Sequence, residues 1–165
     1  MSAIVKRRSS TSLRIPRLSR FAWLMELYGE NHARLERLFE PERIPVGAWI
    51  SSVGDGLDLR LDVVERHPYT IELRLAYAAL EDGATGQPDP SAFVRHYRDA
   101  RQAEVTHCYV GRRWQDVLGL HPPIATIIDH RMRMNVFFGK WLEYLGEQGH
   151  SWHTLRPAAA VADAV

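Results

Sequence analysis

The sequence predicts an α+β domain: an antiparallel sheet of about five strands, packed by an N-terminal and a C-terminal amphipathic helix. Two observations support this fold class. Apolar residues recur at steps of three and four near both ends of the chain, and between these ends they alternate with polar residues at steps of two. Turn-forming Gly and Pro separate the alternating segments. Since 165 residues suit one core of ordinary size, we expect a single domain at residues 19–150.

The first predicted element is a helix over residues 19–39. Ser19 is placed to cap its first turn, and Pro41 ends it because proline has no backbone N–H. One face of this helix is apolar except for a single amide. The residues on that face are Leu24, Tyr28, Asn31, Leu35 and Leu38.

Three strands are predicted next, because apolar and polar residues alternate in each of three segments. The first two segments are joined by Gly54-Asp55-Gly56, whose glycines allow the positive φ of a hairpin turn. His67-Pro68 separates the second from the third. Each strand has one polar side, so we expect one face of the sheet to meet solvent. The strands are expected over residues 48–53, 57–63 and 69–77.

Residues 91–110 fit two different structures. The periodicity slightly favours a helix that Pro90 starts behind a cap at Asp89. The alternative is a pair of strands over residues 93–98 and 103–109, with Asp99 at a bend or bulge between them. The residue pattern alone leaves this choice open.

A second amphipathic helix is predicted after the prolines at residues 122–123. Thr126 and Asp129 have the spacing of a capping-box variant at its start, and Gly146 or Gly149 is its expected end. Its stripe also contains one amide, and we expect the helix to pack on the sheet as the first one does. The residues of this stripe are Asn135, Phe138, Leu142 and Leu145.

Both ends of the chain differ in composition from the predicted domain. The first 20 residues hold six of the 21 Lys and Arg residues and no acid, so the remainder carries 15 basic and 20 acidic residues, a net charge of −5. We expect residues 1–18 to be a disordered basic arm, a type of segment that can contact nucleic acid. Residues 151–165 are mostly small, and we expect a disordered tail there.

Several separate stretches, spread in order over about residues 20–148, together form a pattern that can be compared with known families. They are Leu24-Met25-Glu26-Leu27, Glu30-Asn31, Arg34-Leu35, Arg66, Tyr69-Thr70, Val94-Arg95, Tyr97, Asp99-Ala100, Ala103-Glu104-Val105, Asn135, Phe137-Phe138, Trp141-Leu142 and Tyr144. Together they resemble the YqiB-type family, a bacterial domain of unknown function. The resemblance implies a small cytosolic bacterial protein with an α+β fold and no established activity, and it favours strands over residues 91–110. Tyr28 and Gly29 depart from the family pattern, which has a Cys and a Glu there.

Composition and motifs exclude several classes of protein. No apolar run reaches the roughly 18 residues of a membrane-spanning helix, and a lone Cys108 cannot form an intrachain disulfide, so we expect a cytoplasmic protein. The sequence has no phosphate-binding Gly-rich loop, nucleophile elbow or dinucleotide fingerprint. His96 and His107 are placed to face each other across a hairpin, but the histidines and the cysteine lack zinc-site spacing. No metal and no cofactor are therefore predicted.

The polar block at residues 97–105 is the candidate site. Its two carboxylates, Asp99 and Glu104, lie within six residues and can divide acid and base roles, or can simply pair with arginines on the sheet. Each asparagine of the helix stripes would cost about 1–3 kcal/mol if it were left unpaired. We therefore expect both to point inward and to bond Arg98, Asp99, Glu104 or strand carbonyls. The candidate binding residues are Asn31, Tyr97, Arg98, Asp99, Glu104 and Asn135.

The favoured function is a non-catalytic protein-binding or regulatory module that uses a sheet face or edge. The alternative is a small hydrolase or transferase acting on a phosphorylated or nucleotide-like metabolite, with Arg98, Asp99 and Glu104 at its centre. The enzyme requires these three side chains to converge in a cleft, whereas the module allows them to spread over a surface. A second alternative is nucleic-acid binding through residues 1–18.

Overall fold

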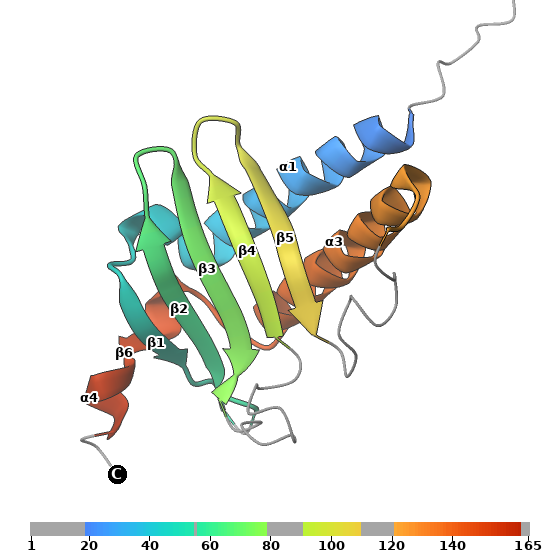
Figure 1. The fold of residues 1–165 in the computed structure, drawn as a ribbon. Coiled ribbons are helices and arrows are strands. Elements are labelled where there is room, and N and C mark those ends of the chain that lie inside the picture. The colour runs from blue at the N-terminus through green and yellow to red at the C-terminus, as the bar shows by residue number, and fades with distance from the viewer. Residues whose placement is uncertain (1–18, 55, 79–90, 110–120, 163–165) are drawn as a thin grey trace, which may run out of the picture.

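One antiparallel sheet dominates the described part of the protein, and two long helices cover one of its faces (Figure 1). The computed structural model describes residues 19–54, 56–78, 91–109 and 121–162. Within these ranges six strands pair in the order β5-β4-β3-β2-β1-β6. The predicted α+β class is confirmed, and the sheet has six strands where about five were expected. The strands are β1 (Gly47–Ser51), β2 (Leu59–Arg66), β3 (Thr70–Tyr77), β4 (Ser91–Tyr97), β5 (Gln102–Tyr109) and β6 (Leu155–Pro157).

The first helix, α1 (Arg20–Phe39), has the predicted limits. The hydroxyl of Ser19 accepts a hydrogen bond from the backbone N–H of Ala22 at 3.2 Å, which caps the first turn. At the other end Glu40 adopts a positive φ of 46°, and the short 3-10 helix η1 (Pro41–Arg43) follows. The face that carries Asn31 is buried, so this amide lies inside the protein.

Residues 91–110 form strands in their described part, and the helical alternative is wrong. β4 and β5 pair through a turn at residues 98–101, where Arg101 has a positive φ of 51°. Ala92, Val94 and His96 alternate into the core, and the pairing shifts by one residue at a bulge between Phe93 and Val94. The helical spacing was misleading because pairing with β3 and burial of these alternating residues override local periodicity.

The second long helix, α3 (Ile124–Glu147), begins directly after Pro123 without a side-chain cap. The capping box expected at Thr126 and Asp129 is therefore wrong. Asp129 instead forms an ion pair of 2.7 Å with Arg20 from the first turn of α1. The end of the helix agrees with the prediction, since Gly149 follows it with a φ of 94°. Among the described residues, neither helix has the length and apolar character to cross a membrane.

The prediction of a disordered tail over residues 151–165 is wrong for its described part. A 3-10 turn, η3 (Trp152–Thr154), leads into β6, which pairs with β1, and the short helix α4 (Ala158–Ala162) follows. The segment is ordered because Leu155 is buried and the Ser51 hydroxyl bonds both His150 Nδ1 (2.7 Å) and the Thr154 hydroxyl (2.6 Å). The predicted basic arm, residues 1–18, lies outside the described residues.

The core lies between the sheet and the two long helices. Leucine, isoleucine and valine side chains of β2 and β3 meet Leu35 and Phe39 of α1 and Phe138 and Leu142 of α3 there. The other face of the sheet carries the polar side chains of β2 to β5 and is covered by neither helix (Figure 1). The predicted alternation thus separates a core face from an outer face.

Candidate functional site

The two stripe asparagines meet in the interior, at the contact between α1 and α3. Asn31 Nδ2 donates to the backbone oxygen of Asn135 (3.0 Å) and to its Oδ1 (3.3 Å). Asn135 Oδ1 also accepts the backbone N–H of Val105 on β5 at 3.1 Å, and its Nδ2 donates to the Arg131 carbonyl at 2.8 Å. The partners differ from those expected, because the asparagines bond each other and a strand N–H. The network ties both helices to the edge strand.

Glu104 is a meeting point for four elements. Its carboxylate accepts hydrogen bonds from the hydroxyls of Tyr28 (3.4 Å) and Tyr97 (3.2 Å), and it pairs with Arg131 of α3. The side chain of Glu104 is only 12% exposed. Burial raises the pKa of Tyr28 and of Tyr97, which keeps both hydroxyls protonated as donors. The carboxylate is therefore fully engaged within the fold.

Arg98 and Asp99 lie elsewhere, in the turn between β4 and β5. Arg98 pairs with Glu42 at 3.1 Å and donates to the carbonyl of Pro68 at 3.0 Å. The hydrogen bond from Arg98 holds the pKa of the Glu42 carboxyl below its usual range. Asp99 accepts the backbone N–H of Ala100 at 2.8 Å, a local turn interaction. The polar block thus separates into a buried half around Glu104 and an exposed half at the hairpin tip.

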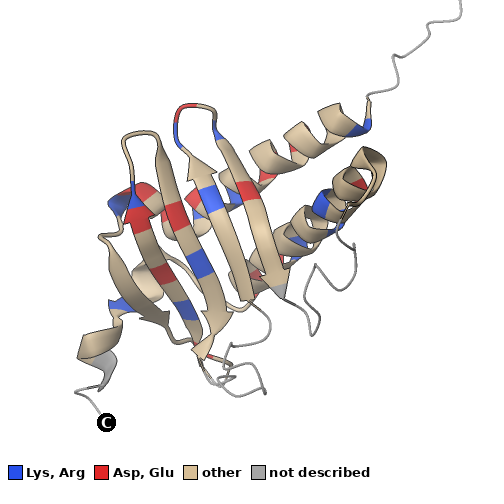
Figure 2. Ribbon diagram, viewed as in Figure 1, with Lys and Arg blue, Asp and Glu red and all other residues tan. Residues whose placement is uncertain are grey.

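The outer face of the sheet carries charges of alternating sign (Figure 2). Glu72, Arg95 and Glu104 lie opposite one another on β3, β4 and β5, and Arg95 bonds Glu72 at 3.1 Å. Asp62 of β2 lies opposite Arg74 of β3, with 3.9 Å between their charged atoms. Cross-strand pairs of this kind stabilise a solvated sheet face. The face is therefore polar, and its charges are largely paired.

A cluster that the sequence analysis missed lies where α1 crosses β4. His32 and Glu36 of α1 approach His96 of β4, and the ligand-type atoms of all three lie within 4.8 Å of one another. The rings of His32 and His96 stack with centroids 4.6 Å apart. His96 does not face His107 as expected, because it lies opposite Ala103 and points into the core. The only signal in the sequence was the four-residue spacing of His32 and Glu36, which places them on one side of a helix.

Burial controls the titration of this cluster. It lowers the pKa of His96, which is completely buried, to about 4. Burial also lowers the pKa of His32, with a further contribution from His96, and raises the pKa of the Glu36 carboxyl. Both imidazoles are therefore neutral at neutral pH.

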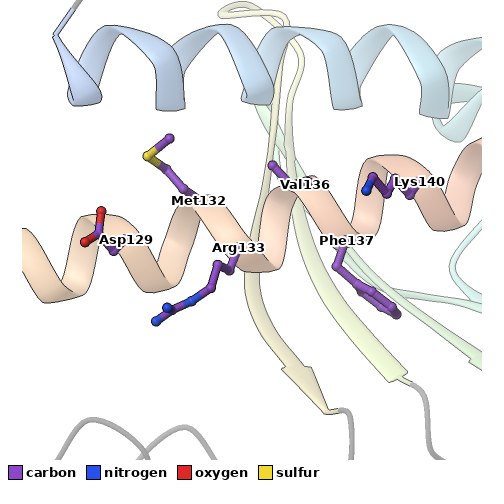
Figure 3. Close-up of a pocket in the computed structure, with 6 residues that line it drawn as sticks. All are labelled: Asp129, Met132, Arg133, Val136, Phe137 and Lys140. Atoms are coloured by element: carbon purple, nitrogen blue, oxygen red, sulfur yellow. The ribbon is translucent and has the colours of Figure 1, made fainter.

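A pocket of about 490 Å³ lies along α3 (Figure 3). All of its lining side chains come from this one helix, and they mix charged and apolar groups. None of the six candidate binding residues lines it. The lining residues are Asp129, Met132, Arg133, Val136, Phe137 and Lys140.

Comparison with known proteins assigns a family. The model of a family described as "Protein of unknown function (DUF1249)" matches residues 34–151, which include both halves of the polar block, all of α3 and the C-terminal end of α1. No curated protein matches the chain. No solved structure matches it either. The matched segment covers more than half of the sequence, and the chain belongs to the DUF1249 family.

Proposed function

We propose that the protein is a non-catalytic protein-binding module whose partner contacts the outer face of the sheet at its hairpin end. The observation that carries this proposal is the separation of Arg98 and Asp99 from Glu104. An acid and base pair must converge on one reacting group, whereas here Asp99 closes a turn and Glu104 is held by two tyrosines and an arginine. This arrangement favours a binding surface over a hydrolase or transferase centre.

The hairpin end of the sheet has the composition of a protein contact. The turns β2–β3 and β4–β5 lie side by side (Figure 1), and the backbone N–H of Arg98 donates to the Tyr69 carbonyl at 2.9 Å. Tyr69 is 67% exposed and Val64, at a bulge of β2, is 49% exposed. The Arg98 guanidinium contacts the β2–β3 turn, where it donates to the Pro68 carbonyl at 3.0 Å, and Arg95 of β4 adds a charge on the outer face. Exposed apolar side chains with a charged rim are typical of protein interfaces. We call Val64, Tyr69, Arg95 and Arg98 the hairpin surface.

The sheet edges are poorly suited to adding a strand from a partner. On β5, Asn135 of α3 already accepts the backbone N–H of Val105. On the opposite edge, β6 has three residues, and one of them is Pro157. Short strands, proline and covering side chains are devices that block edge pairing. These features support a partner on the face of the sheet and not on its edge.

The residues that resemble the YqiB-type pattern also support a more specific relationship within the family. We infer that the chain is a bacterial relative of the YqiB-type proteins, acting in the cytoplasm. Membership of a family of unknown function adds no activity to this inference.

The test is affinity capture from native lysate followed by titration of the purified partner. The full chain is compared with Tyr69→Ala and with Tyr144→Ala, a control tyrosine of α3 that is 50% exposed. Tyrosine is enriched among the interface residues whose truncation costs more than about 1 kcal/mol, so Tyr69→Ala is expected to weaken the partner's affinity by at least about 5-fold. Tyr144→Ala is expected to leave the affinity unchanged. Equal affinity for all three proteins would contradict the proposal.

A second experiment tests the alternative that the protein is an enzyme. Purified protein is incubated with phosphorylated and nucleotide-like metabolites, and turnover is compared between the wild type and Asp99→Asn. Turnover that Asp99→Asn abolishes would replace the binding module with an enzyme. We expect no difference between the two proteins, because Asp99 is engaged in a turn.

A further inference from the structure

We propose that His32, Glu36 and His96 form a binding site for a divalent transition-metal ion of the zinc class. The three residues come from two elements that are far apart in sequence, α1 and β4, and their ligand atoms gather within 4.8 Å. Two imidazoles and one carboxylate are a donor set that zinc accepts, and three protein ligands leave a fourth position open. This proposal is independent of the protein-binding function.

Three buried polar atoms of the cluster have no hydrogen-bond partner in the part of the chain that the structure describes. These are both ring nitrogens of His96 and Oε1 of Glu36. His96 Nε2 and Glu36 Oε1 are 2.8 Å apart, but their alignment does not satisfy a hydrogen bond. Buried polar atoms are nearly always bonded in folded proteins. A metal ion would use the lone pairs of both residues at once.

The distances require the cluster to close. Tetrahedral zinc bonds of about 2.0–2.2 Å place two ligand atoms about 3.4 Å apart, whereas the ligand atoms of the cluster lie within 4.8 Å of one another. The rings of His32 and His96 are nearly parallel, at 18°, so their in-plane lone pairs do not yet meet at one point. His32 and Glu36 are only half-buried on α1, so both can turn toward the fixed ring of His96.

Two arginines near the cluster, Arg98 and Arg66, already have partners, while Arg101 adds a positive charge near His32. Arg98 pairs with Glu42 at 3.1 Å. Arg66 donates to the carbonyls of Pro41, Ile44 and Glu42 at the end of α1. Their charges are therefore partly offset, and Glu42 adds a negative charge near His96. A dication is compatible with these surroundings.

The test is titration of the metal-free full-length protein with Zn²⁺, followed by calorimetry, and with Co²⁺, followed by its visible absorption. His96 is fully buried, so the variants are placed at the half-exposed positions, as His32→Ala and Glu36→Gln. His67→Ala is the matched control, because His67 also pairs with a carboxylate, Glu65, at 3.1 Å but is exposed. Thermal melts with and without Zn²⁺ report whether the metal binds the folded state.

We expect the wild type and His67→Ala to bind one equivalent of Zn²⁺ and to melt at a higher temperature in its presence. Changes in the outer shell of a metal site cost about 10–100-fold in affinity, and loss of a direct ligand costs at least as much. His32→Ala and Glu36→Gln are therefore expected to weaken binding by about 100-fold or more and to lose the melting shift. Saturable binding that survives both substitutions, or no saturable binding by the wild type, would overturn the proposal.

Discussion

Replacing each buried asparagine by alanine distinguishes their roles in the network. Both Asn31 and Asn135 are completely buried, so Ala removes the same volume at each site and the cavity costs are comparable. Asn135→Ala also removes the acceptor of the Val105 N–H, which is left unpaired inside the protein. An orphaned buried donor costs about 1–3 kcal/mol.

Asn31→Ala has no such penalty. The Asn31 side chain only donates, and its Oδ1 has no partner among the described residues, so its removal eliminates an unsatisfied oxygen. Asn135 Oδ1 keeps the Val105 N–H when Asn31 is removed. We therefore expect Asn135→Ala to lower the free energy of unfolding by about 1–3 kcal/mol more than Asn31→Ala does.

Urea denaturation of the full chain, followed by tryptophan fluorescence, measures this difference. If the free energy of unfolding falls with urea concentration at the same slope for both variants, their unfolded states expose similar surface. The urea concentrations at the unfolding midpoints can then be compared directly. A difference near zero, or a larger loss for Asn31→Ala, would refute the assignment of Asn135 as the acceptor that ties α3 to β5.

Three further predictions concern packing, acid stability and the loop after α1. Gly29→Ala is expected to stabilise the protein by up to about 1 kcal/mol, because the added Cβ meets nothing within 4 Å. Gly139→Ala is expected to destabilise the protein, because the added Cβ lies 2.8 Å from Asn31 Oδ1; thermal melts of the two variants test both expectations. Burial lowers the pKa of His150, so as pH falls below about 6.5 the unfolded state takes up a proton that the folded state resists, and the free energy of unfolding falls. His150→Gln is expected to flatten this part of a profile of the free energy of unfolding against pH. An unchanged profile would refute this role of His150. Arg66→Lys is expected to cost about 1–3 kcal/mol in urea denaturation, because one ammonium cannot reach the three carbonyls that the guanidinium bonds. Arg20→Lys, in the exposed pair with Asp129, is expected to cost under about 0.5 kcal/mol, and equal losses for the two variants would contradict this.

The fold class follows from the sequence because each element has its own hydrophobic period. α1 and the strands β2 and β3 match their predicted segments closely, since Ser19, Pro41 and His67-Pro68 mark their limits. Periodicity failed at β4 and β5, where pairing between strands decides the structure. It also missed β6, because three residues are too few for any period and their order comes from β1.

The candidate site was only partly accessible to sequence reasoning. A polar residue on an apolar stripe predicts burial, and Asn31 and Asn135 are indeed buried. Their mutual hydrogen bonds depend on how two helices separated by more than 80 residues align, which no local pattern encodes. The approach of His96 to His32 has the same origin, because the sheet brings β4 over α1.

The central claim is that the polar block divides into a structural half around Glu104 and a binding half at the hairpin surface. The most direct test measures one quantity, the affinity of the captured partner, in variants of the two halves that remain folded. We predict that Arg98→Ala weakens the partner by at least about 5-fold, as an interface arginine does. Glu104→Gln, which keeps a side chain of the same size beside Tyr28 and Tyr97, should bind as the wild type does. Loss of partner affinity in folded Glu104→Gln, with Arg98→Ala unaffected, would contradict the account.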